Sequence, residues 1–299
     1  MIVIPVVSRD GTLTHYFEHG TENFHEFQVK ISLTSSSKNR LRNVSFRIFI
    51  PPDDNHQRLR TMRSNSPYAI RYYSEDNRVL EFSVEVVPPR RLEKIHFYGE
   101  LVLRPFYVGD YWGLADRDKP ITNNVSGRLQ NPQRREILDI VDRLKLYEIT
   151  DIRQIVLRCV KYLRSKVRYF RSPYRLGALF ALKHGKGSCD EISDLLVAIL
   201  KARNIEARSI IGYYLHSGLH EWVEVKTEKG WVPVDPTMGL IGGLGSRWLK
   251  LCAEPKPSIH PIRISGTGWG SISVEVLLDN KIVMKKRVVT PKGTKRWVV

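Results

Sequence analysis

The sequence contains few cysteines, and their spacing is not that of a structural site. Among its 299 residues there are three, Cys159, Cys189 and Cys252. An odd and widely spaced set supplies neither a disulfide framework nor the paired ligands of a zinc site. We therefore expect a protein of a reducing compartment.

Long apolar runs are also missing. No stretch reaches the ~18 apolar residues that a membrane span requires. Residues 1–7 are apolar but contain Pro5, and neither basic residues nor a small-residue cleavage site accompany them. This start lacks the pattern of a signal peptide. A cytoplasmic location without a membrane span is expected.

Acidic residues are in the minority, 31 against 48 Lys and Arg, so the formal charge is +17. Two segments carry most of the excess. Residues 128–187 contain 15 basic and 5 acidic residues, a net of +10, and residues 281–299 contain 7 basic and no acidic residues. Residues 188–280 contain 9 basic and 11 acidic residues, a net of −2. Basic patches attract nucleic acid, acidic proteins or anionic membranes, but they do not determine a fold.

The first hundred residues have the pattern of half-buried strands. Apolar and polar residues alternate over 27–33, 44–50 and 80–86, and Pro, Ser and Asn residues separate the runs. Short alternating strands with such breakers favour an antiparallel β-sandwich.

Composition and periodicity divide the chain into four regions. We expect an N-terminal β domain over 1–110, a Gly- and Asn-containing linker over 111–127, a mixed core over 128–254 and a C-terminal β segment over 255–299. The last contains a predicted hairpin with its turn at Asp279-Asn280, which either extends the N-terminal sheet or forms a small cap. The fold class expected is α+β.

Helical periodicity begins after the predicted linker. One helix is expected over 137–146, and a second from Asp151, its cap, to about Arg168. Cys159 lies on the apolar face of the second helix, which favours a packed core thiol. The opposite face is basic and carries Arg153, Arg158, Lys161, Arg164 and Arg168. This face is either simply solvated or an anion-binding stripe.

A third predicted helix begins at a cysteine. Ser188 and Glu191 have the spacing of a capping box, which makes Ser188 the N-cap and Cys189 the first helical residue. The positive end of the helix dipole stabilises a thiolate there, whereas the carboxylates of Asp190 and Glu191 oppose it. Asn204 can end this helix in the left-handed conformation.

A predicted hairpin over 220–237 follows this helix. If Val225 pairs with Gly230 across a four-residue loop, His220 lies opposite Asp235 on the same face of the sheet. An imidazole beside a carboxylate has a fixed tautomer and is stabilised as an imidazolium.

Together with Cys189, this pair would supply a nucleophile, its base and an orienting carboxylate. Taken singly, each residue is more often structural. The dipeptide His220-Glu221 also resembles the start of a zinc-protease motif. That motif needs a second histidine where this chain has Glu224, so we expect no metal site. His184 and His216 are the alternative candidates for the base.

Three sequence blocks, 187–191, 220–225 and 230–237, resemble the transglutaminase-like superfamily within a pattern over about 129–251. The resemblance implies a papain-like cysteine-protease core, in which helices pack on an antiparallel sheet. The family contains protein-crosslinking enzymes, peptide N-glycanases and microbial hydrolases, all of which attack an amide with a thiolate and form an acyl intermediate.

By this resemblance Cys189 corresponds to the nucleophile, His220 to the general base and acid, and Asp235 to the orienting carboxylate. This chain has Asp190 where the animal crosslinking enzymes have an aromatic residue. It also lacks their acidic calcium loop and the paired zinc cysteines of the glycanases. The resemblance therefore points to the microbial type of member and implies no cofactor.

The expected function is a cysteine-dependent amide hydrolase or acyltransferase, protease-like or transglutaminase-like, that acts on a protein or peptide amide. Trp222 and Trp231 either belong to the fold or wall an acyl-binding groove. Arg208 is expected in a structural ion pair. The Cys189 backbone amide is one expected oxyanion donor, and the sequence does not indicate the second.

A second function stays open. The chain could be a transglutaminase-like scaffold without catalysis that binds a polyanionic partner, such as nucleic acid, through its basic patches. Nucleic acid is the less expected partner, because all three chemical groups of the triad are retained. An acidic partner on the basic helix face is compatible with either function.

Overall fold

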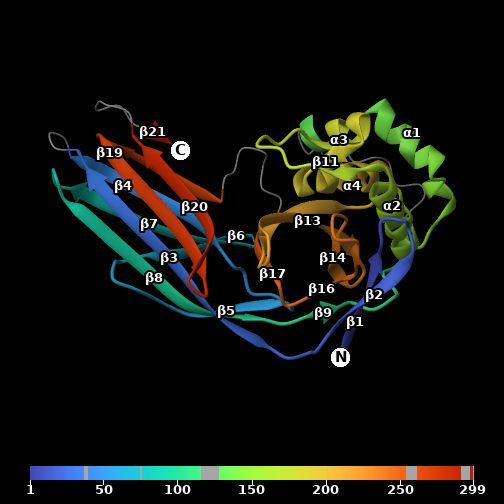
Figure 1. The fold of residues 1–299 in the computed structure, drawn as a ribbon, viewed down its shortest axis with the longest axis horizontal. Coiled ribbons are helices and arrows are strands. Elements are labelled where there is room, and N and C mark those ends of the chain that lie inside the picture. Colours follow the sequence, from blue (N-terminus) through green and yellow to red (C-terminus); the bar gives the residue numbers. More distant parts are fainter. Residues whose placement is uncertain (37–39, 75, 116–127, 254–260, 291–296, 299) are drawn as a thin grey trace.

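The computed structural model describes residues 1–36, 40–74, 76–115, 128–253, 261–290 and 297–298. Two five-stranded sheets form one end of the molecule, and a seven-stranded sheet covered by helices forms the other (Figure 1). The expected α+β class with largely antiparallel strands is confirmed. Residues 116–127 of the predicted linker and residues 291–296 and 299 of the basic C-terminal segment lie outside the described residues.

The sandwich consists of two sheets whose inner faces share one apolar core. One sheet has the order β21 (Trp297–Val298), β18 (Ile262–Thr267), β4 (Leu41–Ile50), β7 (Asn77–Val87) and β6 (Ala69–Ser74). The other has the order β20 (Lys281–Val289), β19 (Gly270–Leu278), β3 (Asn23–Ser35), β8 (Leu92–Leu103) and β5 (Gln57–Ser64). Phe82 and Phe97 meet between the sheets with ring centroids 4.9 Å apart. The predicted β-sandwich is confirmed.

The C-terminal hairpin extends the N-terminal sheet and is not a separate cap. Strand β19 pairs antiparallel with β3, with Val274 opposite Ile31. Asp279 and Asn280 form the β19–β20 turn with φ of +48° and +63°, the left-handed conformation that two-residue hairpin turns require. The sandwich core is therefore assembled from both ends of the chain.

The seven-stranded sheet also combines distant segments. Its order is β17 (Trp248–Ala253), β12 (Ala207–Tyr214), β13 (Gly218–Thr227), β14 (Gly230–Asp235), β15 (Leu240–Ile241), β1 (Ile2–Val7) and β2 (Leu13–Glu18). Strand β1 joins through Val6, which lies opposite Leu240. Nearby, β16 (Gly243–Leu244) pairs with β9 (Phe106–Tyr107). The domain boundaries stay a prediction, but the pairing places the first two strands with the core sheet.

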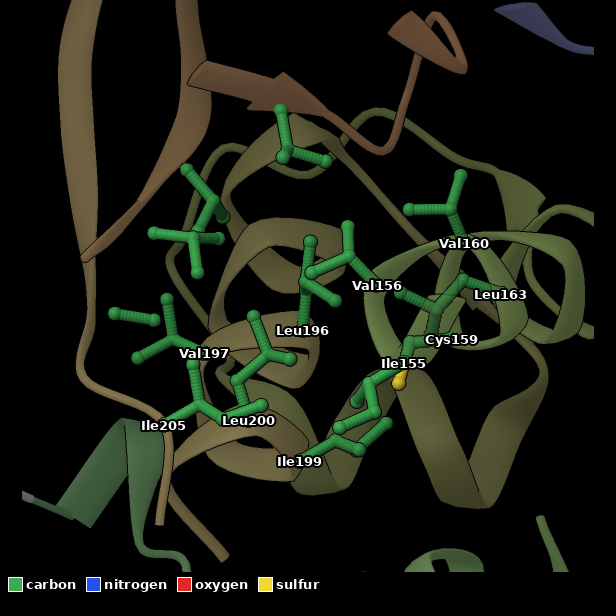
Figure 2. Close-up of a cluster of buried hydrophobic side chains, with 14 of the residues drawn as sticks. Ile155, Val156, Cys159, Val160, Leu163, Leu196, Val197, Ile199, Leu200 and Ile205 are labelled. Atoms are coloured by element: carbon green, nitrogen blue, oxygen red, sulfur yellow. The ribbon is translucent and has the colours of Figure 1, made fainter. Parts of the chain in front are cut away.

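Helices cover one face of this sheet. They are α1 (Arg135–Arg143), α2 (Ile152–Lys166), α3 (Ala178–His184) and α4 (Cys189–Ala202), with short 3-10 turns η1 (Arg128–Gln130) and η2 (Leu146–Glu148). Side chains of α2 face those of α4, and Val156, Val160 and Leu196 lie in one buried cluster (Figure 2). In the described part of the chain, no helix is both long and apolar enough to cross a lipid bilayer.

The predictions for α2 are confirmed. Asp151 is its N-cap and accepts a hydrogen bond from the Gln154 N–H at 3.1 Å. Cys159 is completely buried, and burial raises the pKa of its thiol to about 12. Such a thiol is inert packing material. Helix α3 was not predicted, because its seven residues are too few for a clear periodicity.

A buried ion network joins the sandwich to the core. Arg208 donates to Glu224 and to Asp76 at 2.6 Å each, and Lys250 donates to the same two carboxylates at 2.8 Å each. Asp76 lies in the turn between β6 and β7 of the sandwich, whereas the other three residues belong to the core sheet. The predicted structural ion pair of Arg208 is confirmed, and it fixes one part of the molecule against the other.

Gly212 leaves room for a buried tryptophan, so a larger residue there should destabilise the fold. A Cβ at this position would lie 2.1 Å from a Trp222 ring atom and 2.3 Å from the Leu249 carbonyl oxygen. We expect Gly212→Ala to lower the free energy of unfolding by about 2 to 3 kcal/mol, as overpacked cores do. Urea denaturation measures this change. Gly20→Ala is the matched control, because its nearest neighbour would be 3.9 Å away; equal changes in both variants would contradict the prediction.

Candidate active site

The candidate nucleophile lies at the start of α4. Ser188 is the N-cap and Cys189 is the first helical residue, as the capping-box pattern predicted. The Glu191 carboxylate accepts hydrogen bonds from the Ser188 N–H at 2.9 Å and from the Leu176 N–H at 2.7 Å. Cys189 is partly exposed, whereas the other two cysteines are buried. Asn204 has φ +63°, which confirms the left-handed end predicted for this helix.

The segment before Cys189 is held by a short parallel pairing. Strand β10 (Arg168–Tyr169) lies beside β11 (Lys186–Gly187), and the Phe170 N–H donates to the Gly187 carbonyl at 2.8 Å. A Cβ on Gly187 would lie 2.8 Å from the Cβ of Glu191, so only glycine fits beside the capping carboxylate. The pairing places Tyr169 near the thiol. Burial, and next the charge of Cys189, raise the pKa of the Tyr169 phenol, which therefore stays protonated.

His220, on β13, and Asp235, at the end of β14, meet in the seven-stranded sheet. The Nε2 atom of His220 lies 2.7 Å from Oδ2 of Asp235, and both side chains are buried. Hydrogen bonding with the Cys189 side chain is among the causes that raise the pKa of His220. Since Nε2 faces the carboxylate, Nδ1 is the ring nitrogen left for the thiol. The structure thus brings the three predicted residues together.

The predicted hairpin register was wrong by two residues. Thr227 pairs with Gly230 across a two-residue turn, and Val225 lies opposite Val232. His220 and Asp235 are consequently diagonal neighbours and not direct cross-strand partners. Their predicted proximity survives because side chains on a strand repeat every two residues, so a slip of two keeps each on its face. The prediction of a valine core on the opposite face is confirmed.

Asp235 is held by four hydrogen bonds. His220 and the Trp248 indole N–H, at 2.9 Å, share Oδ2. The backbone amides of Thr237 and Met238 donate to Oδ1 at 3.0 and 2.9 Å. The carboxylate is completely buried, so this donor set both orients it and stabilises its charge.

The His220–Asp235 contact is an ion pair at neutral pH. Burial alone would lower the pKa of His220, but the charge and hydrogen bond of Asp235, followed by Cys189, raise it to about 10. Burial alone would raise the pKa of Asp235, yet the charge and hydrogen bond of His220 lower it. The stability that His220 gains from the pair is full below the unfolded histidine pKa of about 6.5 and is lost as pH rises through about 10. The contribution of Asp235, whose pKa is lowered, is present above its usual pKa of 3.8 and is lost in acid.

A second buried cluster supports α4 from the side of β13. Arg175 donates to Asp194 at 2.5 and 3.0 Å and to Glu221 at 2.7 and 2.9 Å. Burial raises the pKa of Glu221 well above its usual range, and Arg175 opposes this shift. The sequence pattern did not indicate Arg175, because it lies in an irregular segment with no periodicity.

A cavity of about 440 Å³ opens beside His220. Tyr169, Tyr214 and Met238 contribute to its wall, together with two arginines, Arg9 and Arg164. Sequence reasoning placed Arg164 on a basic helix face but gave no sign that this face reaches the site.

The other predicted site residues lie elsewhere. Trp222 is completely buried, so it offers no surface to a substrate. Trp231 lies under the Arg208 guanidinium; the central carbon of the guanidinium is 3.8 Å from the centroid of the Trp231 ring. His184 packs against Phe180, and His216 is exposed beside Tyr214. Substrate binding by the two tryptophans therefore gains no support, and neither alternative histidine pairs with Asp235.

Comparisons with known proteins agree with the sequence resemblance. Residues 142–236 match the family model of the transglutaminase-like superfamily, which confirms it. No curated protein matches the chain. A candidate cysteine protease from Cytophaga hutchinsonii has a similar fold, with a TM-score of 0.56 and 14% identity over 93% of this chain and 98% of that chain.

Two further solved structures are similar over part of the chain. A TGase has a TM-score of 0.31 and 15% identity, and the match covers 58% of this chain and 44% of that chain. A candidate protease from Parabacteroides distasonis has a TM-score of 0.30 and 11% identity over 71% of this chain and 46% of that chain.

Replacing Asp235 should change the protonation of His220. In Asp235→Asn, burial remains without the anionic partner, so we expect the pKa of His220 to fall from about 10 to below about 7. An NMR pH titration of labelled histidine, assigned with His220→Gln, measures it. Asp279→Asn removes a second His–Asp contact of the described residues, that of His25, and should leave the His220 titration unchanged. A His220 pKa that Asp235→Asn does not lower would contradict this account.

Removing Arg175 should destabilise the fold strongly. Arg175→Met leaves the carboxylates of Asp194 and Glu221 buried without their cation. We expect the free energy of unfolding to fall by about 3 to 5 kcal/mol, as for other broken buried ion pairs. Arg171→Met, an exposed position nearby, should change it by less than about 0.5 kcal/mol. Similar urea midpoints for the two variants would show that the buried cluster is not required.

Proposed function

We propose that the protein is a cysteine-dependent amide hydrolase or acyltransferase that acts on a peptide-like amide. The observation that carries the proposal is a partly exposed thiol at a helix start that helps to raise the pKa of an imidazole, which is itself paired with a buried carboxylate. Nucleophile, base and orienting group in this order are what thiol-dependent acyl transfer needs. The family match over residues 142–236 supports the same reading.

In the proposed mechanism the Cys189 thiolate attacks the carbonyl carbon of the amide. The raised pKa of His220 keeps the imidazole protonated beside the thiol, and the imidazolium then gives its proton to the leaving amine as the C–N bond breaks. A thioester on Cys189 remains. Water or a second amine attacks it, His220 accepts the proton of that nucleophile, and the thiolate returns.

The start of α4 would stabilise the oxyanion that forms during this attack. The first amides of a helix have no partner within the helix, and the Cys189 N–H is one of them. Its position beside the reacting sulfur suits an oxyanion donor, and the helix dipole adds to its effect.

Asp235 acts through His220 in this proposal. Its four hydrogen bonds hold the carboxylate in one orientation, and the carboxylate in turn fixes the tautomer with Nδ1 towards the thiol. A fixed imidazole avoids the loss of alignment that a free ring would suffer at each turnover.

Acyl-enzyme capture tests the proposal directly. With an activated ester such as p-nitrophenyl acetate, we expect mass spectrometry to find acetyl on Cys189 and none in Cys189→Ala. Asp235→Asn should slow acylation by about 100-fold, within the range for a disabled general base. Adding a primary amine then sorts the products into hydrolysis and amine transfer.

The control for the histidine assignment is His216→Gln, which removes an exposed imidazole near the site. It should leave the acylation rate within about twofold, whereas His220→Gln should reduce it as strongly as Asp235→Asn. Acetyl found on Cys159 or Cys252, or an unchanged acylation rate in Cys189→Ala, would contradict the proposed function.

A further inference from the structure

The cavity beside His220 has a one-sided charge. Besides the protonated His220, two of its lining residues, Arg9 and Arg164, are cationic, and none is Asp or Glu. Clefts lined by charge of one sign concentrate ligands of the opposite sign. The charge of the lining therefore indicates which charge a substrate should carry, whereas the triad indicates only the reaction.

Arg164 is held in place by the backbone. On α2 it lies half-buried, its Nε donates to the Val7 carbonyl oxygen at 3.2 Å, and its Nη1 donates to the Thr237 carbonyl oxygen. These bonds use two of the five guanidinium donors. The group is thus positioned at the cavity wall with donors to spare.

Neither arginine is neutralised by a direct contact with a carboxylate in the described part of the chain. Among the residues that the structure describes, no carboxylate forms an ion pair with Arg9 or Arg164. Burial, and next the charge of Arg9, lower the pKa of Arg164, whereas the charge of Asp235 raises it; the two arginines are therefore close enough to repel each other. Elsewhere in the core, buried or half-buried cations such as Arg175, Arg208 and Lys250 each contact carboxylates.

We propose that Arg164 and Arg9 bind a carboxylate of the substrate in this cavity, so that the enzyme selects peptide amides with an acidic group close to the scissile bond. The inference rests on the proposed function, because it treats His220 as part of the reacting centre. A guanidinium binds a carboxylate through paired N–H donors, and an anion between two arginines removes their repulsion. An acidic side chain and a free C-terminal carboxylate offer the same chemistry.

A pair of alkylating reagents tests the charge preference at Cys189 itself. Iodoacetate carries a carboxylate and iodoacetamide is its neutral counterpart. The rate of alkylation by iodoacetate divided by the rate with iodoacetamide therefore isolates the effect of the charge. We expect the ratio for Cys189 to fall at least threefold in Arg9→Glu and in Arg164→Gln at low salt, and to fall in wild type as salt is added. Arg9 is exposed, so Arg9→Glu keeps the test available if Arg164→Gln does not fold.

Lys161→Gln is the matched control. It removes a positive charge from an exposed position on the same helix, outside the cavity lining, and should leave the ratio unchanged. An equal fall in this variant would show a diffuse field and overturn the site. A fast iodoacetamide reaction with a ratio that neither arginine variant changes would overturn the carboxylate site alone. A Cys189 that reacts no faster than glutathione with either reagent would overturn the proposed function as well.

Peptide protection separates the two sources of the carboxylate. Peptides with a Glu or a Gln side chain, each with a free or an amidated C-terminus, compete with iodoacetamide for Cys189. Stronger protection by the Glu peptides assigns the site to an acidic side chain, and stronger protection by free C-termini assigns it to the chain end. Equal protection by all four peptides would contradict the proposal.

Discussion

The geometry of the candidate site depends on the burial of one carboxylate. Asp235 has no solvent exposure, so its charge is stable only if hydrogen bonds replace water. The four donors come from three places: the imidazole on β13, the indole on β17 and the amides that follow β14. Satisfying this one group therefore fixes three strands relative to one another, and the imidazole that results is the only donor of the four able to reach the thiol.

A second constraint fixes the sandwich against the core. The Arg208, Lys250, Glu224 and Asp76 network is buried at the junction, and removing any single member would leave two buried charges with one counter-charge fewer. The chain passes from the core sheet into the sandwich, returns to the core and enters the sandwich again. Neither part is a contiguous segment, so neither is expected to fold as a simple fragment.

The sequence allowed the local elements to be predicted, but not the contacts between distant ones. The capping box at Ser188, the cap at Asp151 and the turn at Asp279-Asn280 are local patterns with a direct physical cause, and all are confirmed. The hairpin face was right although its register was two residues off, since face depends only on parity. Arg175 and the pairing of β1 with β15 depend on tertiary contacts, which neither periodicity nor spacing reveals.

Tertiary contacts also determine where the charge of the chain is exposed. Residues 188–280 are slightly acidic in sequence, yet Glu191, Asp194, Glu221, Glu224 and Asp235 are all buried. Their charges are used inside the protein, where they bind Arg175, Arg208, Lys250, His220 and backbone amides. Five of the eleven acidic residues in this segment are thus withdrawn from the surface. The cavity beside His220 combines residues of this segment with Arg9 and Arg164, which precede it in the chain, and no Asp or Glu is among its lining residues.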